Sequence, residues 1–190
     1  MTNNNIAILA SGSGSNAENI IRYFKGSKLV SKVLILTDNP KAFVLERAKR
    51  LFVEAIQFNV DDLQNGILLE TLKKQEINFI VLAGFLKLIP KELAEAYNER
   101  IINIHPALLP KYGGKGMYGI RVHASVIMAG EIESGITIHY VNPNYDEGSI
   151  IFQAKCPVLQ CDKPETLAER IHELEHEHYP RVIEELLKKL

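Results

Sequence analysis

Short, continuous apolar runs alternate with helical patterns over the first hundred residues. Such runs are typical of strands that are buried on both faces, as in a parallel sheet. They occur at residues 6–10, 32–37, 79–83 and 101–105, with a weaker candidate at 54–58. Helix-periodic segments separate them, at residues 16–25, 42–52, 62–75 and 90–97. Strands that alternate with helices of this length predict right-handed βαβ units and a doubly wound, mostly parallel α/β sheet.

The pattern changes after Gly135. The segments "GITIHYV" and "SIIFQAKCPV" flank a polar turn at residues 142–148, and together they predict an antiparallel strand pair at the edge of the sheet. From Pro164 onward the sequence predicts a charged C-terminal helix, with Asp162 as its cap and Pro180 as a point where it breaks or kinks. Because no repeat or linker is visible, we expect residues 1–190 to form a single domain.

Composition narrows the classes of partner. The 190 residues include 22 basic and 23 acidic side chains, so bulk charge does not favour a nucleic acid or an anionic membrane. No apolar run approaches the ~18 residues of a membrane span, and we expect a cytoplasmic protein. Cys156 and Cys161 do not have zinc-site spacing and are predicted to be reduced structural thiols.

The turn between the first strand and the first helix reads "SGSGS", residues 11–15. Gly12 and Gly14 permit positive φ and close backbone approach, and Ser15 with Glu18 forms a capping-box pattern. Free backbone N–H groups at such a helix start bind phosphate. A phosphate site is therefore one prediction for this turn.

Two other interpretations of the same turn stay open. Gly12, Gly14 and Ala17 fit the dinucleotide pattern G-x-G-x-x-G/A, and Asp38 ends the second strand, where an acid that binds ribose would lie. This alternative predicts a nicotinamide-dependent oxidoreductase. A turn with a purely structural role is the third possibility.

Asn103 and His105 are the first candidates for catalysis. They lie two residues apart, so a strand points both side chains to the same face, at the carboxyl end where α/β sheets bind ligands. A buried Asn–His pair is also compatible with a structural role. The later polar loop contributes Asp146 and Glu147, and a carboxylate beside His105 would favour an imidazolium and orient it. The three groups together could stabilise an oxyanion and move a proton.

Neither an acyl-enzyme nor a zinc protease is favoured. Ser125 lies in "VHASVI", which is not a nucleophile elbow, so the chemistry points to direct transfer to an amine. The segment "HELEH", residues 172–176, matches the zinc motif H-E-x-x-H. Only fourteen residues follow, with Glu184 or Glu185 as third ligand, and the segment equally fits a solvated charged helix. We expect no metal.

Four segments, "SGSGSN", "VLAGFLKLIP", "NIHPALLPKY" and "YDEGSIIFQAKCPV", occur in the order found in one enzyme family. Over nearly its whole length the chain resembles the glycinamide ribonucleotide formyltransferases, folate-dependent formyltransferases of purine biosynthesis. Residues 103–110 are shared with methionyl-tRNA formyltransferases and formyltetrahydrofolate deformylases, which stay as alternatives. Those enzymes would carry an additional domain, for which we expect no room in this chain.

The resemblance implies a Rossmann-like formyltransferase fold with two functional halves. Residues 1–100 would be the half that binds the ribonucleotide phosphate, and residues 101–190 the catalytic and folate-binding half. The implied catalytic residues are Asn103, His105 and Asp146. The implied ribonucleotide-binding residues are Ser13, Gly14, Ser15, Asn16 and Glu175. The implied folate-binding residues are Phe85, Leu86, Lys87, Leu88, Ile89, Asn103, Asn142, Pro143, Asn144, Tyr145 and Asp146.

The implied reaction is attack of the glycinamide ribonucleotide amine on the formyl carbon of 10-formyltetrahydrofolate, the co-substrate. Asn103 and His105 would stabilise the oxyanion, and Asp146 would orient His105, the general acid. The implied state is a monomer or homodimer without nucleic acid, membrane or metal partners. Two features depart from the family pattern. The glycine-rich loop at 113–119 is longer, which leaves His123 unassigned, and residues 60–70 carry no basic residue for the folate tail.

Overall fold

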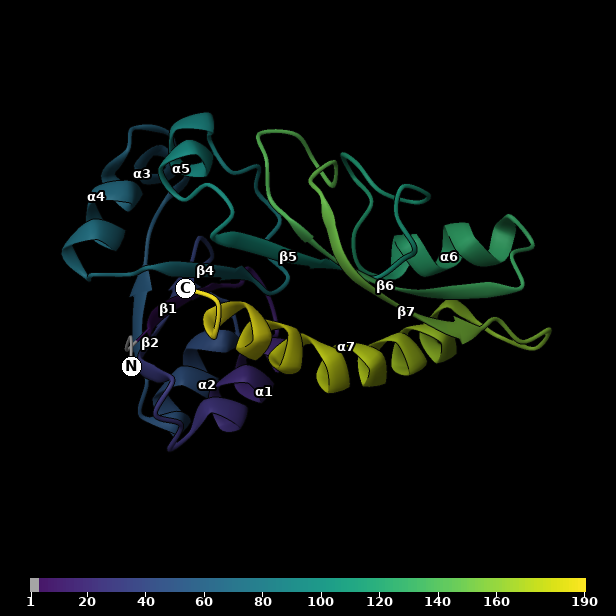
Figure 1. Ribbon diagram of the computed structural model, residues 1–190. Coiled ribbons are helices and arrows are strands. Elements are labelled where there is room, and N and C mark those ends of the chain that lie inside the picture. Colours follow the sequence, from purple (N-terminus) through teal and green to yellow (C-terminus); the bar gives the residue numbers. More distant parts are fainter. Residues whose placement is uncertain (1–3) are drawn as a thin grey trace.

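A seven-stranded sheet forms the centre of the molecule (Figure 1). The computed structural model describes residues 4–190. The strands are β1 (Asn4–Leu9), β2 (Val30–Thr37), β3 (Glu54–Gln57), β4 (Phe79–Leu82), β5 (Ile101–His105), β6 (Glu133–Tyr140) and β7 (Ile150–Pro157). Their order is β3-β2-β1-β4-β5-β6-β7, with β1 to β5 parallel and β6 and β7 antiparallel. The predicted fold class and the C-terminal strand pair are confirmed.

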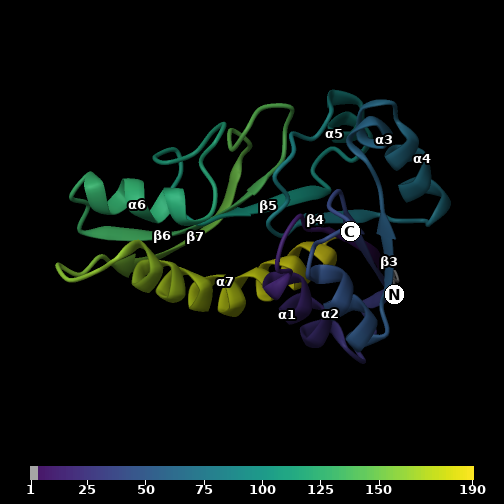
Figure 2. The ribbon, with the colours of Figure 1, turned by 180° about the vertical axis from the view of Figure 1, so that it is seen from behind.

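Helices cover both faces of this sheet. They are α1 (Ser15–Phe24), α2 (Val44–Leu51), α3 (Val60–Gln64), α4 (Ile67–Lys74), α5 (Lys91–Ala96), α6 (Ile120–Met128) and α7 (Pro164–Leu187). Helices α1, α2 and α7 lie on one face, and α3, α4 and α5 lie on the other (Figures 1 and 2). Within residues 4–190, no helix is both long and apolar enough to span a membrane.

The alternation of side chains along the strands divides the core into two layers. Ile6 and Ile8 of β1 pack in the layer beneath α1 and α7, whereas Ala7 and Leu9 pack in the layer beneath α3 to α5. On this second face the helices gather at the β3 end, and loops rise over β5 and β6 instead (Figure 1). Polar side chains on that part of the sheet are therefore covered by loops rather than by a helix.

Two helix predictions need correction. The helix expected at 62–75 is divided into α3 and α4, because Gly66 adopts φ +79 and begins the second helix as its N-cap. Such a left-handed conformation suits glycine and interrupts a continuous helix. Helix α6 was not expected at all, since its sequence follows the glycine-rich stretch that we interpreted as a long loop.

The start and the proline of the C-terminal helix also differ from the prediction. Lys163, not Asp162, is the N-cap of α7, and the Asp162 carboxylate instead accepts hydrogen bonds from Thr166 and Arg170. The helix continues through Pro180 without a break. Proline cannot donate to the carbonyl four residues earlier, that of His176. Asn19 Nδ2 donates to this carbonyl at 2.8 Å, so the lost hydrogen bond is replaced from α1.

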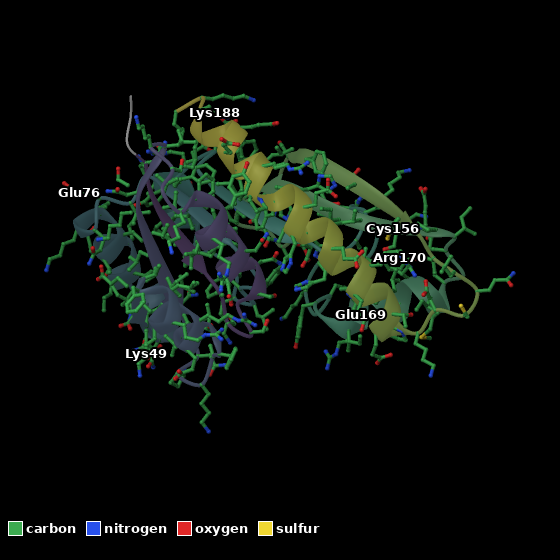
Figure 3. All side chains as sticks on the ribbon, turned by 90° about the horizontal axis from the view of Figure 1, so that it is seen from below. Lys49, Glu76, Cys156, Glu169, Arg170 and Lys188 are labelled. Atoms are coloured by element: carbon green, nitrogen blue, oxygen red, sulfur yellow. The ribbon has the colours of Figure 1, made fainter. Side chains whose placement is uncertain are left out.

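A single tyrosine fixes α7 to two neighbouring strands, β4 and β5. The Tyr179 side chain is fully buried, and its hydroxyl donates to the Leu82 carbonyl at 2.9 Å, with the Ile102 carbonyl 3.3 Å away. Helix α7 crosses the lower face of the molecule from Arg170 to Lys188 (Figure 3). The tyrosine therefore sets the position of this long helix relative to β4 and β5.

We expect Tyr179→Phe to destabilise the fold by about 1–3 kcal/mol, because two buried carbonyls lose a hydrogen-bond donor while the ring still fills its space. Denaturant unfolding measures the change. Tyr23→Phe is the matched control, since its hydroxyl bonds to Glu184 on the surface, and a loss below about 0.5 kcal/mol is expected there. Equal stability of Tyr179→Phe and the parent would contradict the anchoring role.

Candidate active site

A cleft of about 780 Å³ opens at the carboxyl ends of the parallel strands. It lies where α/β sheets bind their ligands, between the loops that follow β1 and β4. Its walls come from the turn after β1, the ends of β4 and β5, the loop before α6, the turn before β7 and one side of α7. The lining segments are residues 12–16, 83–86, 103–106, 114–120 and 145–146, with further residues from α6 and α7.

The three residues predicted to be catalytic meet in this cleft. Asn103 Nδ2 lies 3.4 Å from Asp146 Oδ1, and His105 Nδ1 lies 3.5 Å from Asp146 Oδ2. Asn103 and His105 project from β5 on the same face, and Asp146 reaches them from the turn between β6 and β7. The structure thus brings together groups that are 43 residues apart in the chain.

His139 completes this cluster, although the sequence did not predict it. It is the direct partner of Asn103 in the antiparallel pairing of β5 with β6, with its Nε2 3.1 Å from Asn103 Nδ2 and 3.6 Å from Asp146 Oδ1. Directly opposite residues of antiparallel strands share a face. Alternation within "GITIHYV" could have placed His139 on one face of β6 with Thr137, but nothing local indicated the register with β5.

The backbone holds Asp146 in an unusual conformation. Its φ is +56, in the left-handed region that aspartate tolerates better than most side chains. Gly114 N donates to its Oδ2 at 2.9 Å. Burial alone would raise the pKa of the Asp146 carboxyl, but the hydrogen bond to His139 and the charge of His105 lower it overall. The group is therefore ionised at neutral pH.

Both ring nitrogens of His105 face hydrogen-bond acceptors. Nε2 lies 2.8 Å from the carbonyl of Tyr112, and a carbonyl only accepts, so this nitrogen carries a hydrogen. Nδ1 faces the Asp146 carboxylate. Burial lowers the pKa of His105, and the Asp146 charge and the Tyr112 carbonyl offset this only in part. The Asp146 charge thus favours the imidazolium, but burial of the ring outweighs it.

The turn after β1 presents the start of α1 to the cleft. Gly14 is the N-cap with φ +72, and a Cβ there would lie 2.4 Å from Val44 Cγ2, so both conformation and packing require glycine. The capping box predicted for Ser15 and Glu18 is wrong, because Glu18 instead pairs with arginines that include Arg47. No side chain of residues 4–190 caps α1, which leaves its first N–H groups facing the cleft.

Asp38, the acid of the dinucleotide alternative, is held by protein groups. Its Oδ1 accepts a 2.6 Å hydrogen bond from Ser11, and its Oδ2 lies 3.9 Å from Lys87 Nζ. The carboxylate therefore orders the two loops that enclose the cleft.

Helix α7 supplies the acidic group at the phosphate-turn end of the cleft. Glu175 is 8% exposed, and its Oε2 accepts from Asn16 Nδ2 at 2.8 Å and from His172 Nδ1 at 2.9 Å. The hydrogen bond from His172 to this carboxylate raises the pKa of the imidazole. His176 stacks on His172 at 4.3 Å between ring centroids. Within residues 4–190, no group of three or more His, Cys, Asp or Glu side chains is arranged to hold a metal ion.

Only some residues of the two segments predicted to bind folate line the cleft. Phe85, Leu86, Tyr145 and Asp146 line the cleft. Ile89 is 2% exposed and packs in the core layer beneath α3 to α5. The remaining members, Lys87, Leu88, Asn142, Pro143 and Asn144, lie outside the cleft lining.

Comparisons with known proteins agree with this site. A family model described as Formyl transferase matches residues 4–183. The phosphoribosylglycinamide formyltransferase of Bacillus subtilis is 39% identical over 187 residues, which cover 95% of this chain and 93% of the relative. The chloroplastic phosphoribosylglycinamide formyltransferase of Arabidopsis thaliana is 41% identical over 185 residues, or 94% of this chain. The chain spans 63% of that plant relative and 61% of the one from Vigna unguiculata.

The fold is also similar to that of a solved relative. The crystal structure of glycinamide ribonucleotide transformylase 1 from Geobacillus kaustophilus superposes with a TM-score of 0.88 at 38% identity, covering 98% of this chain and 100% of that one. The match favours the formyl transferase family over the nicotinamide-dependent alternative. With its Rossmann-like sheet, its cleft at the strand ends and its match over residues 4–183, the chain belongs to the formyl transferase family.

Proposed function

We propose that the protein transfers the formyl group of 10-formyltetrahydrofolate to the amine of 5'-phosphoribosylglycinamide, a step of purine biosynthesis. One observation carries the proposal: the uncapped start of α1, suited to a phosphate, and an Asn–His–Asp cluster line the same cleft. Relatives named for this activity support the choice of substrate. A single active site would then join a phosphate anchor to an acyl-transfer centre.

The ribonucleotide occupies the end of the cleft formed by α1 and α7. Its phosphate binds at Ser13, Gly14 and Ser15, where the uncapped N–H groups of α1 and the positive end of the helix dipole favour an anion. Asn16 and Glu175, hydrogen-bonded to each other, face the sugar. The glycinamide amine then extends toward β5.

The folate occupies the other end. Phe85 and Leu86 from the loop after β4 and Tyr145 from the turn before β7 give it an apolar wall. The lining thus draws on residues from both halves of the chain, and the division at residue 100 stays a prediction.

The reaction begins when the amine nitrogen attacks the formyl carbon. The carbonyl electrons move to oxygen, and Asn103 Nδ2 and His105 Nδ1, beside the Asp146 carboxylate, are the side-chain donors for it. The Nδ1–H that protonated His105 carries, 3.5 Å from the Asp146 carboxylate, can donate to the oxyanion. Collapse of the intermediate breaks the bond to N10 of the folate, which takes a proton.

The lining of the cleft favours direct attack over an acyl-enzyme, because its described residues include no serine or cysteine outside the phosphate turn. Both serines of the lining, Ser13 and Ser15, belong to the phosphate turn, and neither cysteine is among the lining residues. An acyl-enzyme has no nucleophile next to His105 within the described residues.

The decisive experiment is a spectrophotometric assay with both substrates. Formation of tetrahydrofolate that depends on the ribonucleotide is the expected result. Hydrolysis of the formyl-folate without an acceptor would instead indicate a deformylase, and binding of the ribonucleotide without turnover would indicate a sensor.

We expect His105→Ala to lower kcat by about two to four orders of magnitude, because a donor to the oxyanion and the general acid are lost together. His178→Ala is the control, since His178 packs on Phe152 outside the cleft lining and should retain full activity. Near-normal turnover in His105→Ala would overturn its assignment.

The pH profile of Asp146→Asn provides a second test. The Asp146 charge raises the pKa of His105, so its removal lowers that pKa, and protonated His105 is lost at a lower pH. The decline of kcat as pH rises should therefore begin at lower pH in the variant. The maximal kcat should also be lower, by roughly 10²-fold or more. Glu147→Gln changes the neighbouring exposed carboxylate and should leave the profile unchanged. An unshifted alkaline decline in Asp146→Asn would show that this carboxylate does not tune His105.

A further inference from the structure

His123 is a buried side chain that the mechanism has not used. It lies on α6, is 5% exposed and lines the cleft. Its Nδ1 is buried, and within residues 4–190 it has no hydrogen-bond partner. Buried polar atoms are nearly always paired, so an unpaired one beside a cleft indicates a functional use.

The position of His123 connects the two ends of the cleft. The charges of Glu175 on α7 and of His105 on β5 both act on its imidazole. Glu175 faces the proposed ribonucleotide, and His105 faces the proposed formyl group. A substrate that is anchored by phosphate at the α1 start and reaches His105 lies in the cleft that His123 lines.

The other groups near the reacting atoms already have partners. Both nitrogens of His105 face acceptors, and as the general acid this ring begins the reaction protonated, without a free lone pair. Asp146 accepts from Gly114, and Glu175 accepts from Asn16 and His172. The attacking amine must nevertheless lose a proton, and a base with a free lone pair is required for it.

We propose that His123 is a further catalytic residue, which accepts the proton that the substrate amine loses as its nitrogen bonds to the formyl carbon. The inference rests on the proposed function. His105 donates a proton to N10 as the bond between N10 and the formyl carbon breaks. The net change is one proton moved from the amine to N10, and the proton on His123 returns to His105 through solvent in the cleft.

The electrostatics of the cleft agree with this role. Burial lowers the pKa of His123, the charge of His105 acts in the same direction, and Glu175 opposes them in part. The imidazole is therefore neutral near pH 7 and keeps one acceptor nitrogen. The charged or titratable groups that line the cleft with it are His105, Lys115, Tyr118, Tyr145, Asp146, Glu169, His172 and Glu175.

The test compares His123→Gln with the parent and with Ser125→Ala, a control on the same helix whose hydroxyl bonds to the Arg121 carbonyl. His123→Gln should lower kcat by about 10²–10³-fold, since glutamine hydrogen-bonds but cannot accept a proton. The decline of kcat at acidic pH, measured at saturating ribonucleotide, should also disappear in His123→Gln. Ser125→Ala should retain both.

Three outcomes would overturn parts of this scheme separately. If the parent enzyme itself shows no formyl transfer, the proposed function fails. If the parent is active and His123→Gln retains its kcat, or loses kcat but keeps the acidic decline, the assignment of His123 as base fails. Should His123→Gln not fold, ¹⁵N resonances of the parent imidazole are followed on addition of glycinamide ribonucleotide alone, and an unperturbed His123 contradicts the contact.

Discussion

The register between β5 and β6 is the constraint on which the site depends. Asn103 stands opposite His139, and His105 stands opposite Thr137, so all four side chains share one face of the sheet. A slip of one residue would turn Asn103 and His105 into the apolar layer and bring Ile102 and Ile104 to the cleft. Those two isoleucines are 0% and 6% exposed. Burial on the opposite face therefore holds the polar cluster in place.

At the other end of the cleft, helix α7 likewise positions a polar side chain through a buried anchor. Tyr179 and Glu175 are four residues apart, and i, i+4 positions of a helix share a face. The tyrosine bonds to the carbonyls of Leu82 in β4 and Ile102 in β5, while the glutamate faces the cleft one turn away. Because the replacement hydrogen bond from Asn19 keeps the helix continuous through Pro180, this anchor acts along a single rigid element.

Local patterns predicted most of the fold and part of the site. The parallel strands were found because burial on both faces leaves an apolar run that is visible in the sequence, as in β1 and β4. Asn103 and His105 were found because alternation along one strand is local, while Asp146 was proposed from its loop and supported by family resemblance. His139 needed the register of two strands, and the continuity of α7 at Pro180 needed a partner from α1. Both depend on contacts between distant segments, which local periodicity does not report.

The attachment of the 113–119 loop has an evolutionary consequence. Its first residues are fixed to the catalytic centre: Tyr112 supplies the carbonyl that holds His105, and Gly114 N holds Asp146. A Cβ at Gly113 would lie 2.5 Å from Leu109 and 3.2 Å from the Asp146 Cβ, so this part admits little change. Between Gly114 and the start of α6, the loop makes neither of these two hydrogen bonds to His105 and Asp146. Insertions and deletions in this stretch can therefore accumulate during divergence, altering the rim of the cleft while the catalytic geometry is inherited intact.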